Sequence, residues 1–168
     1  MQQNNDVEAL ISKMAQDIQA KFLPGAEKDL LMIGIHTGGL WIAQRLHRIL
    51  KLEQPLGALD ISFYRDDFSR IGMNPQVKPS KLPVSVDNQQ ILLVDDILHT
   101  GRTIRAAMNE IFDYGRPASI RLIVLGERSG RELPIQPDIV GQHMPLGPHE
   151  HVKLTGPEQL SLTITTTL

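Results

Sequence analysis

Hydrophobic residues recur along the chain with two different spacings, and the way these spacings alternate predicts the fold class. After Asp6, apolar residues at positions 7, 10, 11, 14 and 18 form the stripe of an amphipathic helix that runs to about Phe22. Short continuous apolar runs at 30–35, 91–94 and 120–125 are typical of strands buried on both faces of a parallel sheet. Helical patterns follow the first two runs, at 40–50 and 104–112. This order predicts a doubly wound α/β domain, with a mainly parallel central sheet flanked by helices.

The remaining segments predict a further strand, a long loop and a strand-rich carboxyl-terminal region. Residues 58–64 alternate imperfectly between apolar and polar side chains, which favours a strand. The stretch from about 66 to 88 is punctuated by glycine and proline and predicts a loop, either a mobile lid or a passive surface excursion. Shorter apolar segments near 139–140, 151–154 and 160–165 predict additional strands. We expect Trp41 and Phe112 to pack in the core.

The segment from Ile91 to Thr103 joins a buried strand, two carboxylates and a tight turn. Asp95 and Asp96 come at the carboxyl end of the predicted strand, and residues 100–103 open the next helix. Backbone N–H groups and the positive end of the helix dipole would bind a phosphate there, with threonine hydroxyls as added donors. Adjacent carboxylates suit ribose hydroxyls, or a magnesium ion that also contacts substrate oxygens. The segment predicts a sugar-phosphate site; the alternative is a strand that ends in solvated aspartates before an ordinary capped helix.

A second strand-to-helix turn lies earlier in the chain. The sequence His36-Thr37-Gly38-Gly39 follows the first predicted strand, and paired glycines let backbone amides approach an anion closely. This turn is a second candidate phosphate site, although a tight structural turn would have the same composition. Neither a G-x-G-x-x-G dinucleotide fingerprint nor a G-x-x-x-x-G-K-[ST] phosphate loop is present, which argues against those two classes of nucleotide site.

With Thr-Gly-Arg-Thr after the acidic pair, the main segment resembles the phosphoribosyl pyrophosphate signature of type I phosphoribosyltransferases. Over about residues 10–154, the chain further resembles the family of pyrimidine operon regulators with uracil phosphoribosyltransferase activity. Beyond the main segment, the resemblance rests on residues 59–67, 114–117, 131–135, 137–138 and 140–141. It implies a single domain over 1–168, with a mobile loop at about 66–88 and a small carboxyl-terminal hood at about 126–155. It also implies that uracil and phosphoribosyl pyrophosphate are converted to UMP and pyrophosphate with Mg²⁺.

The resemblance also implies the roles of individual residues. The phosphoribosyl pyrophosphate motif would comprise Asp95, Asp96, Ile97, Leu98, His99, Thr100, Gly101, Arg102 and Thr103. Within it, Asp95 and Asp96 would hold the ribose hydroxyls, with magnesium in reach, and the last four residues would bind the 5′-phosphate. The pyrophosphate loop would be Thr37, Gly38 and Gly39, with Arg65 and the neighbouring Asp66 as charge partners. The uracil hood would use Arg128, Ile139 and Val140.

Some positions depart from the family pattern. Gly38 stands where relatives commonly carry arginine, which predicts weaker pyrophosphate binding. His99 stands where purine-using relatives often place a catalytic aspartate, and an imidazole there could accept the uracil N1 proton or simply line the turn. In RNA-binding members, a histidine and an arginine occupy the positions of Gln16 and Gln136. UMP-responsive binding to messenger RNA is therefore a weaker expectation than catalysis.

Other functions fit parts of the same pattern. A regulator that binds UMP but catalyses poorly would need the same acidic pair and phosphate turn. A purine phosphoribosyltransferase is disfavoured, because no aromatic stacking residue follows Leu125. His143, His149 and His151 would suit a metal site, but their expected loop setting favours solvated histidines.

Composition limits the functional classes. The chain has 168 residues, 17 basic and 19 acidic, with a formal charge of −2, so its charge does not indicate a nucleic-acid binder. It contains no cysteine, which excludes disulfides and thiolate zinc sites and is compatible with a reducing cytoplasm. We expect neither a signal peptide nor a membrane-spanning segment. The family resemblance implies a homo-oligomer, a dimer or a larger assembly.

Overall fold

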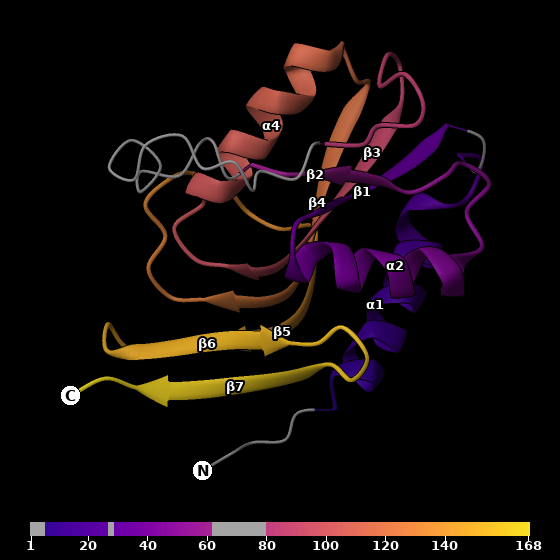
Figure 1. The fold of residues 1–168 in the computed structure, drawn as a ribbon. Coiled ribbons are helices and arrows are strands. Elements are labelled where there is room, and N and C mark those ends of the chain that lie inside the picture. Colours follow the sequence, from indigo (N-terminus) through magenta and orange to yellow (C-terminus); the bar gives the residue numbers. More distant parts are fainter. Residues whose placement is uncertain (1–5, 27–28, 62–79) are drawn as a thin grey trace.

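A computed structural model describes residues 6–26, 29–61 and 80–168 and shows a parallel sheet with helices on both faces (Figure 1). The sheet order is β2-β1-β3-β4-β5, and each neighbouring pair of strands is parallel. The strands are β1 (Leu30–Ile35), β2 (Gly57–Leu59), β3 (Gln90–Leu98), β4 (Ser119–Arg128) and β5 (Ile139–Met144). The helices are α1 (Val7–Phe22), α2 (Gly38–Leu50) and α4 (Arg102–Tyr114). The predicted fold class is confirmed.

The two faces of the sheet have separate apolar cores. Side chains alternate along the central strands, so that Leu92 and Val94 of β3 pack with α1 and α2, while Ile91 and Leu93 pack with α4. Because both faces are covered, the central strands are apolar on both sides, which is why they appear in the sequence as continuous apolar runs. Since neighbouring strands are parallel, the polar residues at their carboxyl ends are brought to one edge of the sheet.

Local sequence explains where the helices begin and end. The carboxylate of Asp6 accepts a hydrogen bond from Ala9 N at 3.1 Å and caps α1. α2 ends at Lys51, which has the left-handed backbone conformation, with φ 50° and ψ 47°. α4 follows Gly101, whose φ of 95° favours glycine. α2 begins at Gly38, earlier than the apolar pattern predicted, because its first turn consists of glycines that carry no periodic signal.

The structure tests the expected core positions of Phe112 and Trp41 and part of the strand expected at 58–64. Phe112 is 57% exposed, so the prediction that it packs in the core is wrong: it lies on the outer face of α4. Trp41 is partly buried against the core beneath α1 and α2. The expected strand at 58–64 is observed as β2 and ends at Leu59, and residues 62–64 lie outside the described part of the chain.

The long loop is described only from residue 80 onward. Residues 66–79 of the expected mobile loop lie outside the described residues, and so do both expected charge partners of the pyrophosphate loop, Arg65 and Asp66. From residue 80 the chain packs on the sheet: Lys81 exchanges backbone hydrogen bonds of 2.8 Å with Ala58, and Val86 is buried. Ser80 Oγ donates to the Glu110 carboxylate of α4 at 2.6 Å and accepts from Asp60 N at 3.0 Å. This carboxyl-terminal part of the loop is therefore tied to β2 and α4.

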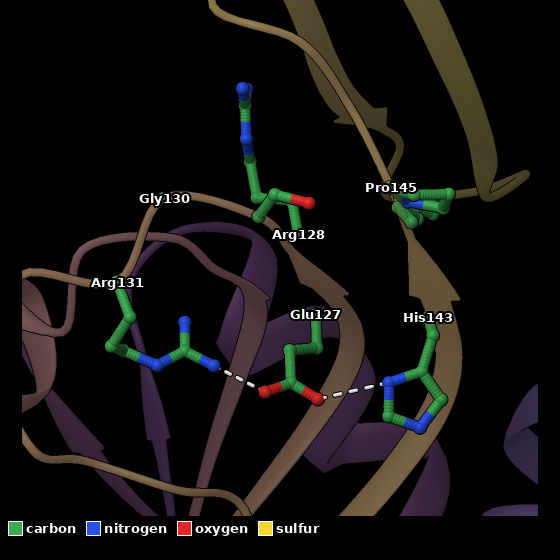
Figure 2. Close-up of a pocket in the computed structure, with 8 residues that line it drawn as sticks. Glu127, Arg128, Gly130, Arg131, His143 and Pro145 are labelled. Carbon is green, nitrogen blue, oxygen red and sulfur yellow. Dashed lines mark hydrogen bonds and ion pairs between the residues drawn. The ribbon is translucent and has the colours of Figure 1, made fainter.

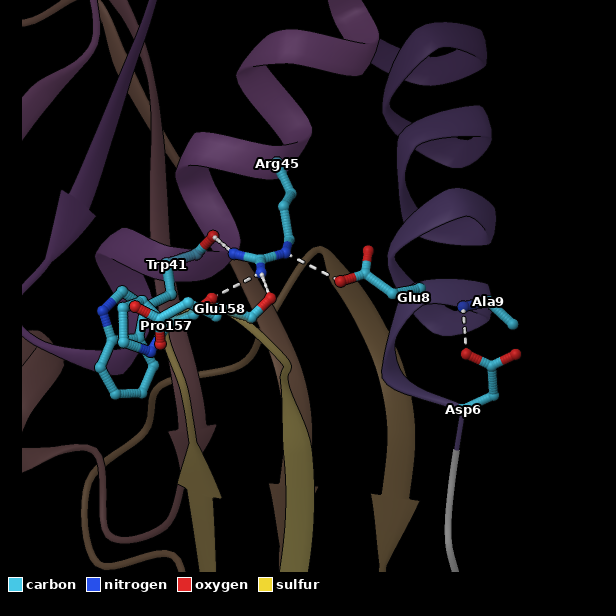
Figure 3. Close-up of polar contacts among 7 residues, drawn as sticks. All are labelled: Asp6, Glu8, Ala9, Trp41, Arg45, Pro157 and Glu158. Carbon is cyan, nitrogen blue, oxygen red and sulfur yellow. Dashed lines mark hydrogen bonds and ion pairs between the residues drawn. The ribbon is translucent and has the colours of Figure 1, made fainter.

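A separate antiparallel hairpin, β6 (Glu150–Thr155) and β7 (Ser161–Thr166), covers the α1–α2 side of the molecule (Figure 1). Its inward residues Leu154 and Leu162 join the core of the two helices. Arg45 of α2 fixes its turn, donating to the carbonyls of Pro157 at 2.7 Å and Glu158 at 3.3 Å (Figure 3). The same guanidinium pairs with Glu8 of α1 at 2.9 Å. In the described part of the chain, no helix is long and apolar enough to cross a membrane.

Candidate active site

The acidic pair of β3 lies where the strand leaves the sheet. Asp95 is only 5% exposed, and Asp96 is half-buried. Asp95 Oδ1 accepts from Asp96 N at 2.9 Å, and Asp96 Oδ1 accepts from Ile97 N at 2.7 Å. These bonds to the following amides fix the two carboxylates locally, and carboxylate oxygens are suitable acceptors for hydroxyls and suitable ligands for a cation.

The glycine turn before α2 lies directly against the acidic pair. An ideal Cβ on Gly39 would lie 2.7 Å from Val94 O and 2.9 Å from Asp95 Cα, so only glycine fits at that position. An ideal Cβ on Gly38 would overlap the Asp96 carboxylate. Two βα turns that are distant in sequence therefore meet at one point, as expected where neighbouring parallel strands end together. The peptide bond between His36 and Thr37 is cis.

The turn from His99 to Thr103 carries the amino terminus of α4. Thr100 Oγ1 accepts from Arg102 N at 3.1 Å, and Gly101, at the N-cap position, makes no side-chain capping bond to the N–H groups further into the first turn. An uncapped helix terminus presents N–H groups and a partial positive charge, which suits a phosphate group. The structure therefore brings this predicted phosphate turn, the acidic pair and the glycine turn together at one edge of the sheet.

The β4–β5 connection, residues 129–138, packs on the phosphate turn. Glu132 N and Leu133 N both donate to Thr100 O, at 3.0 and 3.1 Å. Arg102 forms an exposed ion pair with Glu132 at 3.3 Å. The phosphate turn is thus fixed by main-chain bonds from a segment that is distant in sequence.

Arg131 anchors this connection from the other side. Its guanidinium donates to His99 O at 2.6 Å and to Ile135 O at 2.9 Å, and it forms a close ion pair with Glu127 of β4. Figure 2 shows the chain of contacts continuing from Glu127 to His143 of β5, with 3.0 Å between Oε2 and Nδ1. These side chains line a pocket of about 410 Å³. Arg131 therefore links the phosphate turn to the ends of β4 and β5.

The imidazole of His99 lies over Gly130. An ideal Cβ on Gly130 would be 2.7 Å from His99 Nε2, and the φ of 112° at Gly130 also favours glycine. Burial lowers the pKa of His99 below its ordinary value of 6.5, and the positive charges of Arg128 and Arg131 add to this effect. The neutral ring, which can accept a proton, is therefore the favoured form at neutral pH.

Arg128 is buried beneath the hairpin side of the same pocket. It is 8% exposed and donates to Glu150 O at 2.9 Å and Gly147 O at 3.1 Å. Its Nε is buried without a hydrogen-bond partner among the described residues. Ile139 is buried and Val140 half-buried in β5, next to β4. In the parallel pair β4–β5, Ile139 and Val140 pair with Ile123 and Val124, whereas Arg128 pairs with Met144. The structure therefore places Arg128 at the carboxyl end of β4 and Ile139 and Val140 at the start of β5, and it does not bring the three expected hood residues together.

Comparison with known proteins decides the family. The model of the phosphoribosyl transferase domain matches residues 1–152. The chain belongs to this family. It is 55% identical over 161 residues to bifunctional protein PyrR from Nitrosococcus oceani, covering 95% of this chain and 91% of that protein. It is 54% identical over 153 residues to bifunctional protein PyrR from Pseudomonas aeruginosa (strain LESB58), covering 91% and 90%.

Solved structures of phosphoribosyltransferases share the fold. A hypoxanthine-guanine phosphoribosyltransferase from Bacillus anthracis aligns with a TM-score of 0.67 and 18% identity over 86% of this chain and 83% of its own. A purine phosphoribosyltransferase from Pyrococcus horikoshii aligns with a TM-score of 0.61 and 24% identity over 82% of each chain. At these identities the likeness concerns the fold alone. The chain is a phosphoribosyltransferase, an enzyme of the pentosyl-transferring class.

The donor set of this phosphoribosyltransferase fits magnesium held jointly with a substrate. Among the described residues, no group of three or more His, Cys, Asp or Glu side chains could hold a metal ion by itself. His143 and His151 lie in β5 and β6, so the expected loop setting is wrong for these two histidines, and His149 lies in the turn before β6. Asp95 and Asp96 supply carboxylate oxygens beside two phosphate-sized turns. Magnesium commonly binds through one or two carboxylates plus substrate phosphates, so the acidic pair is a suitable partial site.

Sequence reasoning missed the residues that fix the phosphate turn. Glu127 and Arg131 were not expected to act together, and Glu132 was not expected to contact the turn. Local spacing gives no signal for these contacts, because residues 127–132 leave a strand and do not form a helix. The Arg-Glu-Leu-Pro-Ile run that carries the family resemblance was the available sign that this segment has a specific role.

Proposed function

We propose that this phosphoribosyltransferase converts uracil and 5-phosphoribosyl pyrophosphate to UMP and pyrophosphate. The observation that carries the proposal is the contact between Asp96 and Gly38, which unites a ribose-binding acidic pair with a pyrophosphate-sized glycine turn. The identity above 50% to bifunctional protein PyrR supports uracil as the base, through the resemblance to pyrimidine regulators with this activity. The fold neighbours that use purines are too distant to decide the base.

The reaction exchanges one bond at the anomeric carbon. The bond from C1′ to the pyrophosphate oxygen breaks with its electron pair leaving on pyrophosphate, and a bond from C1′ to uracil N1 forms. Because C1′ becomes oxocarbenium-like, the protein must fix the ribose, bind the leaving charge and exclude water. Asp95 and Asp96 bind the ribose hydroxyls, Thr100 to Thr103 bind the 5′-phosphate, and Thr37 to Gly39 bind the pyrophosphate. Magnesium, when bound through Asp95 and Asp96 or their waters, supplies positive charge beside the pyrophosphate.

His99 is proposed as the acceptor of the uracil N1 proton. Its pKa is lowered by burial and by Arg128 and Arg131, so the ring is free to take a proton at neutral pH. Its ring lies over Gly130, at the edge of the pocket lined by Arg128 and Arg131. The same pocket is our candidate for the uracil hood. Arg128 would then contact the base, whereas Ile139 and Val140 do not line this pocket.

A regulatory activity is the second proposed function. The name bifunctional protein PyrR, which the relatives carry, supports UMP-responsive regulation of pyrimidine biosynthesis genes, with RNA as a candidate partner. The alternative is a nucleotide-sensing regulator with little catalysis, which would use the same acidic pair and phosphate turn. The absence of cysteine fits the proposed cytoplasmic location, and a homo-oligomer, dimer or larger, stays a prediction.

The proposed transferase is tested by uracil-dependent UMP formation from phosphoribosyl pyrophosphate and magnesium. The native chain is expected to turn over, and Asp95→Asn combined with Asp96→Asn is expected to lower kcat/KM by at least about a hundredfold, because two charged contacts to the substrate are lost. Asp87→Asn, at an exposed position beside Arg116, is the matched control and should keep full activity. If the native chain binds UMP but makes none, the sensor is correct and the transferase is wrong.

A further inference from the structure

Gly38 lies at the first position of α2, directly against the side chain of Asp96. An ideal Cβ on Gly38 would overlap Asp96 Oδ2 and would lie 2.9 Å from Asp96 Cγ and 3.1 Å from its Cβ. The backbone of Gly38 does not have the positive φ that by itself favours glycine. The requirement for glycine therefore comes from space alone. The whole side chain of Asp96 occupies the volume that any side chain at position 38 would need.

The position of Asp96 is fixed by its own strand. Asp96 lies near the carboxyl end of β3, two residues after Val94, which packs in the core beneath α1 and α2. Asp96 Oδ1 accepts from Ile97 N at 2.7 Å. To make room for a side chain at position 38, Asp96 would have to rotate and lose this hydrogen bond.

The amino terminus of α2 is where this carboxylate is held. Thr37, the residue before the helix, forms no capping hydrogen bond with its side chain, so the first N–H groups of α2 have no side-chain cap. A helix terminus of this kind attracts anions. A carboxylate at the same point offers oxygen to a divalent cation, and a cation that binds both the carboxylate and a pyrophosphate would join the two.

We propose that Gly38 is a positioning residue for the binding of magnesium pyrophosphate. Because Gly38 has no side chain, Asp96 can lie over the first turn of α2, where its carboxylate and the α2 amides bind the magnesium and the pyrophosphate together. This inference rests on the proposed transferase function. Relatives commonly carry an arginine at the position of Gly38, and here a bound magnesium ion would neutralise the pyrophosphate charge in place of that arginine. Gly38 acts only through Asp96, which distinguishes it from its neighbour Gly39, whose ideal Cβ meets the backbone of Val94 and Asp95.

The test is a double-mutant cycle measured by calorimetric titration of magnesium pyrophosphate into native protein, Gly38→Ala, Asp96→Ala and the double variant. Gly38→Ala is expected to weaken binding about tenfold, while the same change in the Asp96→Ala background is expected to have little further effect. This non-additivity would support a single Gly38–Asp96 unit. An equal loss in both backgrounds, or no loss in Gly38→Ala, would overturn the proposal.

Two glycine variants separate positioning from folding. Gly147→Ala adds a methyl group whose nearest neighbouring heavy atom is Glu150 Oε2, at an ordinary contact distance of 3.5 Å, and this variant should bind magnesium pyrophosphate as the native protein does. Gly39→Ala should lower the thermal midpoint with or without Asp96, whereas Gly38→Ala should keep the native midpoint within a few degrees once Asp96 is alanine. The UMP assay tests the transferase separately. Non-additive binding without UMP formation would support the Gly38–Asp96 unit and overturn the transferase, whereas UMP formation with additive binding would overturn the unit alone.

Discussion

At the scale of single residues, the histidines of this chain have different surroundings, and these surroundings suit different roles. His99 lies over Gly130 and beneath the charges of Arg128 and Arg131, and burial lowers its pKa. His149 is exposed in the turn before β6. The same side chain is therefore a candidate proton acceptor in one place and a solvated surface group in the other.

The lowered pKa of His99 gives a pH prediction. Since the folded-state pKa lies below 6.5, the neutral ring persists as pH falls to that value and is lost only at lower pH. If His99 accepts the uracil proton, kcat/KM should be flat near pH 7 and should fall on the acid side below pH 6.5. His99→Gln should lower kcat by about a hundredfold at pH 7.5 and should remove this acid limb. The measurement is a pH profile of UMP formation from pH 5 to 9.

His149→Gln is the matched control for that profile, because the same substitution is made at an exposed position. It should keep both the rate and the acid limb. An unchanged acid limb in His99→Gln would show that another group titrates and that His99 only lines the turn.

At the scale of secondary-structure elements, the β6–β7 hairpin depends on contacts with other elements. An isolated two-stranded hairpin is marginal in water, and here Leu154 and Leu162 bury its inner face against the helices. Arg45 fixes the turn through the carbonyls of Pro157 and Glu158, with its side chain 17% exposed. The hairpin also accepts the Arg128 hydrogen bond at Glu150 O, so its position affects the proposed uracil pocket.

Removal of Arg45 should loosen the hairpin. Arg45→Met keeps much of the apolar stem but loses the charged donors to the carbonyls of Trp41, Pro157 and Glu158, which should lower the free energy of unfolding by about 2 kcal/mol. Glu8→Gln breaks only the exposed side of the cluster, where Glu8 is 59% exposed, and should cost less than about 1 kcal/mol. Urea denaturation of both variants measures the difference. If both variants lose the same free energy of unfolding, Arg45 stabilises the protein through its ion pair with Glu8 and not through its bonds to the hairpin turn.

At the scale of the whole molecule, charge limits the partners. The formal charge is −2, and the surface pocket between α1 and β5 is lined by Asp17, Glu127 and Asp138 as well as Lys21 and Gln136. Because RNA affinity depends on phosphate neutralisation, this surface does not favour tight binding at physiological salt.

RNA binding should therefore be weak and sensitive to salt. We expect a Kd above about 1 μM for a labelled pyrimidine-gene leader transcript at 150 mM salt, measured by fluorescence anisotropy with UMP present. Gln136→Arg adds a cation to the pocket and should strengthen binding and steepen its salt dependence by about one unit in the log–log slope. Gln136→Lys adds the same charge without a guanidinium group, so it separates the effect of charge from the effect of arginine geometry. Nanomolar binding by the native chain at this salt concentration would contradict the charge argument.

The sequence by itself determined the features that depend on neighbouring residues. The apolar runs at 30–35 and 120–125 and the helical stripes between strands fixed the parallel α/β fold, because burial on both faces or on one stripe leaves a local signature. The strand, the acidic pair and the turn at Ile91 to Thr103 were predictable for the same reason. The strand boundaries at 58–64 were less well defined, since edge strand β2 is short and has little periodic signal.

Tertiary structure alone decided the contacts between segments that are distant in sequence. No local pattern indicates that Asp96 fills the space above Gly38, that Arg131 donates to His99 O, or that Arg45 fixes the hairpin turn. The exposure of Phe112 likewise depends on which elements cover α4, and not on its own hydrophobicity. The physical reason is that spacing along the chain sets local conformation, whereas the sheet order sets which strand ends meet, and the active site is built where they meet.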